Sequence, residues 1–300
     1  MSEKLNEIRG KIDSLDNKIH DLLMQRAELI RDVSVEKQKS GAPIVHPARE
    51  AMMIRRLLDR HTGILPQAAI VGIWRELVGA VSMLQRGLQV YVSAQQDEEF
   101  CWDMAKDYFG SVLPMTRVAS PLAAIAHVRE NRDAIAVLPW PEDETQRPWW
   151  SALAHQEADS HSASRVRIVA ALPHGAPVPI TECYKKALVI GRIDYLPSGH
   201  DNSFVAIDVP QPLSRAKIID IFKAQKIETL SIFTQVDAAL NITSHLVEIA
   251  CYLDKEDAIL QVINEVLEPV KGRCIRLGGY PVPPIFRAGD TNPVDVKGLM

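Results

Sequence analysis

Apolar residues in the first forty positions follow a helical period. They recur every three or four residues, at Leu5, Ile8, Ile12, Leu15, Ile19, Leu22, Leu29 and Val33. This spacing puts them on one face of an α-helix and predicts a single helix over residues 3–40, roughly 55 Å long at about 1.5 Å per residue. Such a helix cannot bury its stripe alone, so we expect a partner helix along it.

Two shorter helices are expected next. Pro47 suits the first position of a helix that ends near His61, and a third helix follows Pro66 and ends near Arg86. The apolar stripe expected for the third helix consists of Ile70, Ile73, Trp74, Leu77, Val81 and Leu84. These helices leave much of the long first helix uncovered, so an intertwined homodimer is predicted.

From Leu88 onwards, short apolar runs alternate with helical stretches, which predicts an α/β layer. After residue 198 the expected order is strand, helix, strand, strand, helix, strand, which is typical of a ferredoxin-like sandwich. The expected fold class is therefore multi-domain. It has an all-α helical domain over 1–87, an α/β single-lobe layer over 88–198, an α+β ferredoxin-like domain over 199–285 and a flexible tail over 286–300.

Composition narrows the function classes. No apolar run reaches the ~18 residues of a membrane span, the N-terminus alternates charges, and Cys101, Cys183, Cys251 and Cys274 form no C-x-x-C pair. We therefore expect a cytoplasmic protein with reduced thiols and no membrane partner. Residues 1–86 hold 14 Lys and Arg against 11 Asp and Glu with one aromatic residue, Trp74, which disfavours nucleic acid and favours a small anion as ligand.

Charged residues interrupt the apolar pattern of the first helix. Arg26 stands where the stripe predicts an apolar residue, and Lys37 lies eleven residues further on, within roughly 20° of Arg26 around the helix. Arg9 is 17 residues before Arg26 and points about 100° away from it. Arg9 therefore cannot easily serve the same pocket from the same chain, although it could serve the pocket of a partner chain.

Polar residues on the other two helices extend this group. Arg49 and Glu50 lie in the first turn of the second helix, and Gln85 lies one turn after Val81 on the third. The pattern by itself also fits a surface interpretation, in which these side chains extend into solvent and Gln85 caps a helix end.

The stretches LNEIRGKIDSLDNKIHDLLMQRAEL, VEKQ, PIVHPAREAMMIRRL and IWRELVGAVSMLQ resemble the all-helical chorismate mutase family in order and spacing, over residues 3–86. The resemblance implies an isomerase of aromatic amino-acid biosynthesis that rearranges dianionic chorismate to prephenate without cofactor or metal. It implies catalytic roles for Lys37, Gln85 and Glu50. Substrate binding is implied for Arg9 of the partner chain, Arg26, Arg49 and His46. His46 stands where an aspartate is common, and Val81 where a serine is common.

The remaining chain resembles, in its overall order, bifunctional chorismate mutase/prephenate dehydratase proteins that end in an ACT-type regulatory domain. The dehydratase-like part is short, its Gly-rich opening reads SAQQDEEF, and Tyr184, Lys185 and Lys186 replace the Thr-Arg-Phe signature. We therefore expect a degenerate remnant without dehydratase activity, and an ACT-like domain of structural or regulatory role. Two alternatives stay open: a bifunctional enzyme, and a non-catalytic amino-acid sensor or partner-binding module.

Three further features are interpreted structurally. His155, Glu157, Asp159 and His161 in HQEADSH resemble alternating metal ligands, but this composition is typical of a polar loop, so no metal is expected. Trp149 and Trp150 are expected to pack in the α/β layer. Gly278 and Gly279 indicate a bulge or a strand end.

Overall fold

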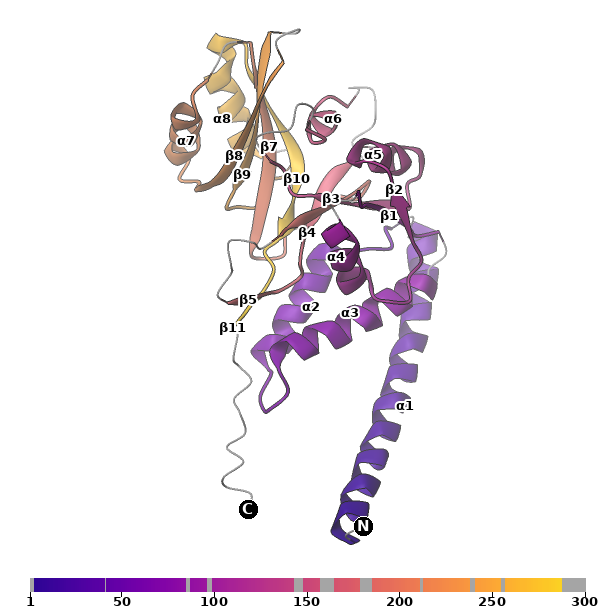
Figure 1. Ribbon diagram of the computed structural model, residues 1–300. Helices are drawn as coiled ribbons and strands as arrows, with labels where there is room; N and C mark the ends of the chain where they lie inside the picture. Colours follow the sequence, from indigo (N-terminus) through magenta and orange to yellow (C-terminus); the bar gives the residue numbers. More distant parts are fainter. Residues whose placement is uncertain are drawn as a thin grey trace.

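The N-terminal region consists of three helices, α1 (Glu3–Ser40), α2 (Pro47–Asp59) and α3 (Gln67–Leu84). The computed structural model describes residues 3–40, 42–84, 87–95, 99–142, 148–156, 165–178, 185–210, 213–237, 241–254 and 257–287. All three predicted helices are confirmed, and Figure 1 shows α1 extending as one long rod away from the rest of the chain. None of the helices in these ranges is long and apolar enough to cross a membrane.

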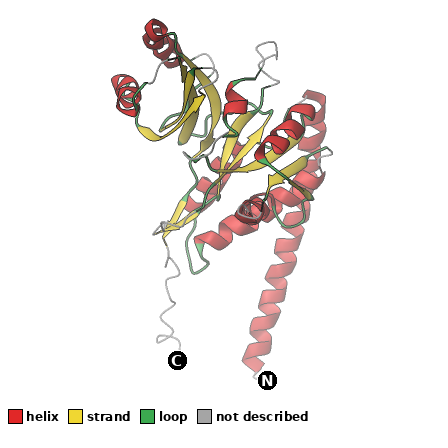
Figure 2. Ribbon diagram, turned by 45° about the horizontal axis from the view of Figure 1, so that its top comes forward, coloured by secondary structure: helices red, strands yellow, loops and turns green. Residues whose placement is uncertain are grey.

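The rest of the described chain is built around one nine-stranded sheet, in the order β2-β1-β3-β6-β4-β10-β7-β9-β8. Helices pack against it in two groups, as Figure 2 shows. The strands and helices are β1 (Gln89–Ser93), α4 (Glu99–Phe109), β2 (Met115–Val118), α5 (Pro121–Glu130), β3 (Ala134–Pro139), α6 (Ser151–Ala154), β4 (Arg167–Leu172), β5 (Ala176–Val178), β6 (Ala187–Gly191), β7 (Asp201–Val209), α7 (Arg215–Ala224), β8 (Thr229–Asp237), β9 (Ile242–Ile249), α8 (Ala258–Leu267), the 3₁₀ helix η2 (Glu268–Val270), β10 (Arg273–Pro281) and β11 (Ile285–Arg287).

The first half of the sheet is the predicted α/β layer. β1 pairs with β2 and β3 in parallel, and β6 pairs antiparallel with both β3 and β4. β4 and β6 are buried along their whole length, which explains their continuous apolar runs. Trp149 and Trp150 are buried in the core of this layer, which confirms their interpretation as packing residues.

The second half has the predicted ferredoxin-like order. β7, α7, β8, β9, α8 and β10 follow one another along the chain, and their strands form the antiparallel series β10-β7-β9-β8. The α7 and α8 helices bury Ile218, Phe222 and Ile263 against the apolar side chains of this series. The α+β prediction for this region is confirmed.

The two halves join through β10 and β4, a contact that the local pattern does not predict. Gly278 pairs with Ile168 in parallel, next to a bulge between Arg276 and Gly278. A Cβ atom at Gly278 would lie 2.2 Å from the Ile168 carbonyl oxygen, and the residue has a φ of +116°. Only glycine fits this crossing. The bulge interpretation is confirmed.

The prediction of a flexible tail over residues 286–300 is wrong for its first two residues. Phe286 and Arg287 belong to β11, whose backbone pairs in parallel with β5, more than a hundred residues earlier in the chain. Three residues are too few to show a strand period, and their partner strand is remote in sequence, so the local pattern gives no sign of the pairing. Residues 288–300 lie outside the described part of the chain.

The helical region packs against the α/β layer through α3 and α4, which lie side by side in Figure 1. A Cβ atom at Gly79 of α3 would lie 1.8 Å from the Phe109 carbonyl oxygen, so the backbones touch here. The most buried positions of α3 are not those of the expected apolar stripe. Ile73 is 47% exposed, whereas Val71, Arg75, Gly79 and Ser82 are buried, and the close backbone contact at Gly79 leaves no room for a side chain.

Candidate active site

The loop 42–46 between α1 and α2 is held from both sides by charged residues of the predicted site. Lys37, in the last turn of α1, donates through Nζ to the Ile44 carbonyl oxygen at 2.9 Å. Glu50, in the first turn of α2, accepts a hydrogen bond at Oε1 from the His46 backbone N–H at 3.3 Å. The ends of two helices and their connection therefore bring Lys37, His46 and Glu50 into one place.

A buried arginine, Arg75, also binds the Glu50 carboxylate. Arg75 of α3 donates to Glu50 Oε2 at 2.9 Å, and its guanidinium lies 4.4 Å from the centre of the Tyr108 ring of α4. Burial alone would lower the pKa of Arg75, but the adjacent Glu50 carboxylate raises it above the ordinary value. A buried charge is stable only with such a partner, so Arg75 fixes the position of Glu50.

Burial and the neighbouring charges shift the pKa values of Lys37 and His46 in this site. Burial lowers the pKa of Lys37, Arg49 lowers it further, and Glu50 partly opposes them. Burial and the nearby Lys37 lower the pKa of His46 below its ordinary value of 6.5. The imidazole is therefore neutral at neutral pH, so His46 does not supply the negative charge of an aspartate at this position.

The two arginines of α1 lie apart from this group. Arg26 is half-buried on the same side of the helix as Ser34 and Lys37, and burial lowers its pKa. Arg9 is exposed near the far end of α1, 28 residues before Lys37. At about 1.5 Å per residue the two residues are roughly 42 Å apart along one helix. Within one chain, Arg9 and Lys37 cannot contact the same small molecule.

The remaining predicted site residue, Gln85, follows the end of α3 in the sequence. Gln85 lies outside the described residues, next to the last described residue of α3, Leu84. The Ser82 hydroxyl donates to the Val78 carbonyl oxygen of its own helix at 2.9 Å. Ser82 therefore does not replace the hydroxyl that is missing at Val81.

Sequence reasoning missed Arg75 and Tyr108. A signal was present for Arg75, because a charge within the apolar stretch IVGIWRELVGAV needs a buried partner. No comparable signal marked Tyr108, whose side chain is 2% exposed and belongs to the helix that covers α3. Burial and Glu50 raise the pKa of Tyr108, so its hydroxyl stays protonated.

The motif HQEADSH is only partly described. His155 Nε2 lies 3.5 Å from Asp208 Oδ2, whereas Glu157, Asp159 and His161 lie outside the described residues. Within the described ranges, no three His, Cys, Asp or Glu residues are grouped as metal ligands.

Comparisons with known proteins show which family the helical region resembles. Residues 8–86 match the family described as "Chorismate mutase type II". The chain is 47% identical over 64 residues to the chorismate mutase of Methanocaldococcus jannaschii, a match that covers 20% of this chain and 65% of that protein. The N-terminal region therefore carries a chorismate mutase domain.

A longer match extends into the α/β layer. The chain is 30% identical over 142 residues to the bifunctional chorismate mutase/prephenate dehydratase of Aquifex aeolicus. This match covers 46% of the chain and 39% of the relative, so the chain matches less than half of that relative's length. Among solved structures, the prephenate dehydratase of Streptococcus mutans is 16% identical with a TM-score of 0.45, and the alignment covers 67% of this chain and all of that chain.

Proposed function

We propose that this protein is a chorismate mutase, which converts chorismate to prephenate by an intramolecular Claisen rearrangement. The observation that carries the proposal is the group of Lys37, His46, Arg49 and Glu50 around the loop 42–46, inside the segment that matches the chorismate mutase family. The reaction breaks a carbon–oxygen bond and forms a carbon–carbon bond within one molecule, so it needs no nucleophile and no redox group.

The proposed residue roles follow from the charge of the substrate and of its transition state. Chorismate has two carboxylates, and its ether oxygen gains negative charge as the carbon–oxygen bond breaks. Lys37 and Gln85 would donate to that oxygen, while Arg26 and Arg49 would bind carboxylates. Glu50 would accept a hydrogen bond from the ring hydroxyl, because its two carboxylate oxygens keep free lone pairs beside the bonds from Arg75 and His46.

A complete site requires a second copy of the chain. Arg9 would bind the second carboxylate, but it is roughly 42 Å from Lys37 along α1 of its own chain. The apolar stripe of α1 is exposed in the single chain, from 40% at Leu5 to 67% at Leu29. Two antiparallel copies of α1 would cover the stripe and bring Arg9 of one chain to Arg26 and Lys37 of the other.

The C-terminal regions are proposed to have structural or regulatory roles. The α/β layer is short and lacks the Thr-Arg-Phe signature, which favours a remnant without dehydratase activity. A bifunctional enzyme is the second candidate, and the two activities named for the Aquifex aeolicus relative favour it.

One assay tests these proposals together. Purified protein is mixed with chorismate, and the loss of chorismate and the formation of prephenate and phenylpyruvate are followed. We expect enzyme-dependent conversion to prephenate that stops there. Absence of any catalysed loss of chorismate would instead favour a non-catalytic sensor built on the mutase domain.

A further inference from the structure

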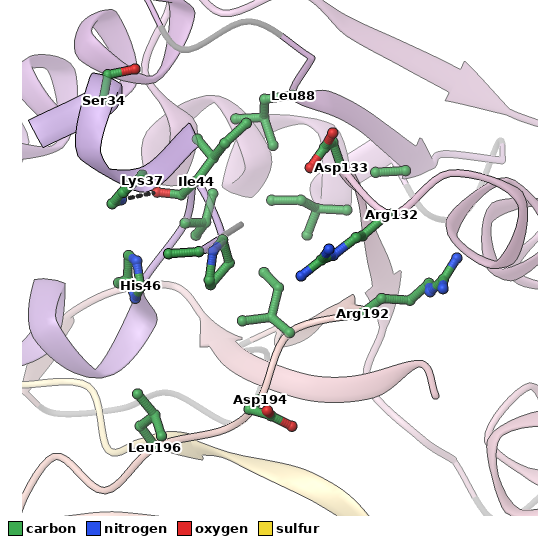
Figure 3. A pocket seen from close by; sticks show the side chains of 16 residues that line it. Ser34, Lys37, Ile44, His46, Leu88, Arg132, Asp133, Arg192, Asp194 and Leu196 are labelled. Carbon is green, nitrogen blue, oxygen red and sulfur yellow. Dashed lines mark hydrogen bonds between the residues drawn. The ribbon is translucent and has the colours of Figure 1, made fainter. Parts of the chain in front are cut away.

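A cavity of about 450 Å³ lies between the mutase domain and the α/β layer. One wall consists of the end of α1 and the loop 42–46, and the opposite wall consists of residues 132–135, 192–194 and 196 (Figure 3). We call this cavity the junction pocket. Lys37 and His46 of the candidate active site line it, while the opposite wall belongs to a region to which no mutase role is assigned.

The position of two arginines in this wall follows from strand pairing. Ile135 of β3 pairs with Gly191 of β6 in antiparallel register. The residues just before β3 and just after β6 therefore lie at the same end of these two paired strands. Arg132 and Arg192 both line the pocket there, although 60 positions separate them. Both are attached to buried strands, so their backbones form a rigid wall.

The pocket combines an apolar lining with the side chains of two arginines. Its apolar lining includes Ile44, Leu88, Ile135, Ile193 and Leu196. Figure 3 shows the Arg132 guanidinium directed into the cavity. Arg192 donates from one terminal nitrogen to the Arg129 carbonyl oxygen at 3.1 Å, but its buried Nε has no hydrogen-bond partner among the residues that the structure describes. A buried donor without a partner is costly, and a turn of the Arg192 side chain toward an acceptor in the pocket would remove that cost.

We propose that the junction pocket is a second ligand site, which binds a small carboxylate with an apolar body. The carboxylate would accept hydrogen bonds from Arg132 and Arg192, and the apolar body would lie against Ile135, Ile193 and Leu196. Asp133 and Asp194 also line the pocket and suit an ammonium group, so an apolar amino acid and a simple carboxylic acid share the required chemistry.

The bound carboxylate would lower mutase activity, a consequence that rests on the proposed function. Lys37 lines the pocket and donates to the carbonyl of Ile44, which also lines it. An anion in the pocket would attract the Lys37 ammonium and compete with chorismate for it. By linkage, chorismate would weaken the binding of the carboxylate by the same factor.

The first test is isothermal titration calorimetry of the full-length protein with 3-phenylpropanoate. We expect binding, at least about tenfold weaker binding of phenethylamine, which lacks the carboxylate, and a similar loss in Arg132→Ala. Arg117→Ala is the matched control, because Arg117 pairs with Glu99 away from the pocket, and it should leave the affinity unchanged. Equal affinity for phenethylamine, or an unchanged affinity in Arg132→Ala, would disprove the carboxylate site.

Two further measurements complete the test. L-Phenylalanine binding more tightly than 3-phenylpropanoate would identify an amino acid as the ligand type, and equal binding would identify a simple carboxylate. In mutase assays, 3-phenylpropanoate should raise the KM for chorismate in the wild type and much less in Arg132→Ala. Equal inhibition of both proteins would place the probe in the mutase site and overturn the proposal. If the protein has no mutase activity, calorimetry still decides whether the junction pocket binds the probe.

Discussion

Arg75 and Glu50 form a buried ion pair across 2.9 Å, with the Arg75 side chain only 2% exposed and that of Glu50 13% exposed. The pair joins α3, which packs on the α/β layer, to the first turn of α2, which carries the proposed catalytic carboxylate. Arg31 and Glu28 of α1 form a pair of similar length, 2.6 Å, but both side chains are more than 60% exposed. Substitutions in the two pairs therefore show how burial changes the contribution of an ion pair to the stability of the protein.

Arg75→Met should destabilise the protein by about 3–5 kcal/mol, because it leaves the Glu50 carboxylate buried without its partner. Arg31→Met, the matched control, should change stability by less than about 1 kcal/mol. Urea unfolding followed by circular dichroism measures both. Similar values for the two variants would show that the buried pair does not fix Glu50. Where Arg75→Met still folds, kcat for chorismate should also fall, whereas Arg31→Met should keep it.

Arg9→Ala and Arg26→Ala should each lower mutase activity by ~10² or more, since each removes a carboxylate contact of the transition state. When the two inactive proteins are refolded together, each mixed dimer should have one intact pocket. About half of wild-type activity per mixed dimer is then expected from a two-fold symmetric dimer.

The control mixture is Arg26→Ala with Lys37→Ala. These two residues are proposed to serve the same pocket from the same chain, so a mixed dimer has a defect in each pocket and should stay inactive. The cross-chain role of Arg9 is wrong if the first mixture also stays inactive although subunit exchange is demonstrated.

A charge added to the exposed stripe of α1 should dissociate the proposed dimer. Ile12→Glu puts a carboxylate into the apolar interface, whereas Asn17→Glu adds the same charge on the other side of the helix. Sedimentation velocity should show monomers for Ile12→Glu and dimers for Asn17→Glu. A wild-type protein that sediments as an active monomer would contradict the shared site.

The pH dependence of catalysis should reflect Lys37. Burial and the neighbouring Arg49 lower the pKa of Lys37 from the ordinary 10.5. The cation is therefore lost at a lower pH than in an ordinary lysine, and kcat/KM should fall on the alkaline side below that value. Lys37→Arg should shift this fall to higher pH, because a guanidinium stays protonated. An unchanged pH profile in Lys37→Arg would assign the titration to another group.

Prephenate should not be converted to phenylpyruvate. The α/β layer lacks the Thr-Arg-Phe signature and is short for a dehydratase, as expected of the proposed remnant. Incubation with prephenate, followed by chromatography, should show phenylpyruvate only at the rate of a protein-free sample. Faster formation with the protein present would support the bifunctional alternative.

The sequence by itself determined the elements that depend on near neighbours. The long helix α1, Pro47 at the start of α2 and the ferredoxin-like order of the last strands and helices are all observed as predicted. Helical and strand periods place residues two to four positions apart on one face, so each element can be recognised from its own segment.

Only the tertiary structure decided which of these elements meet. The pairing of Gly278 with Ile168, the pairing of β11 with β5 and the packing of Gly79 on Phe109 all join distant segments. The same holds for Arg75 between Glu50 and Tyr108, and for Arg132 and Arg192 in the junction pocket. These contacts depend on close backbone approach and on the pairing of buried charges between residues that are remote in the sequence. The local period of hydrophobic and polar positions contains no information about which remote residues meet.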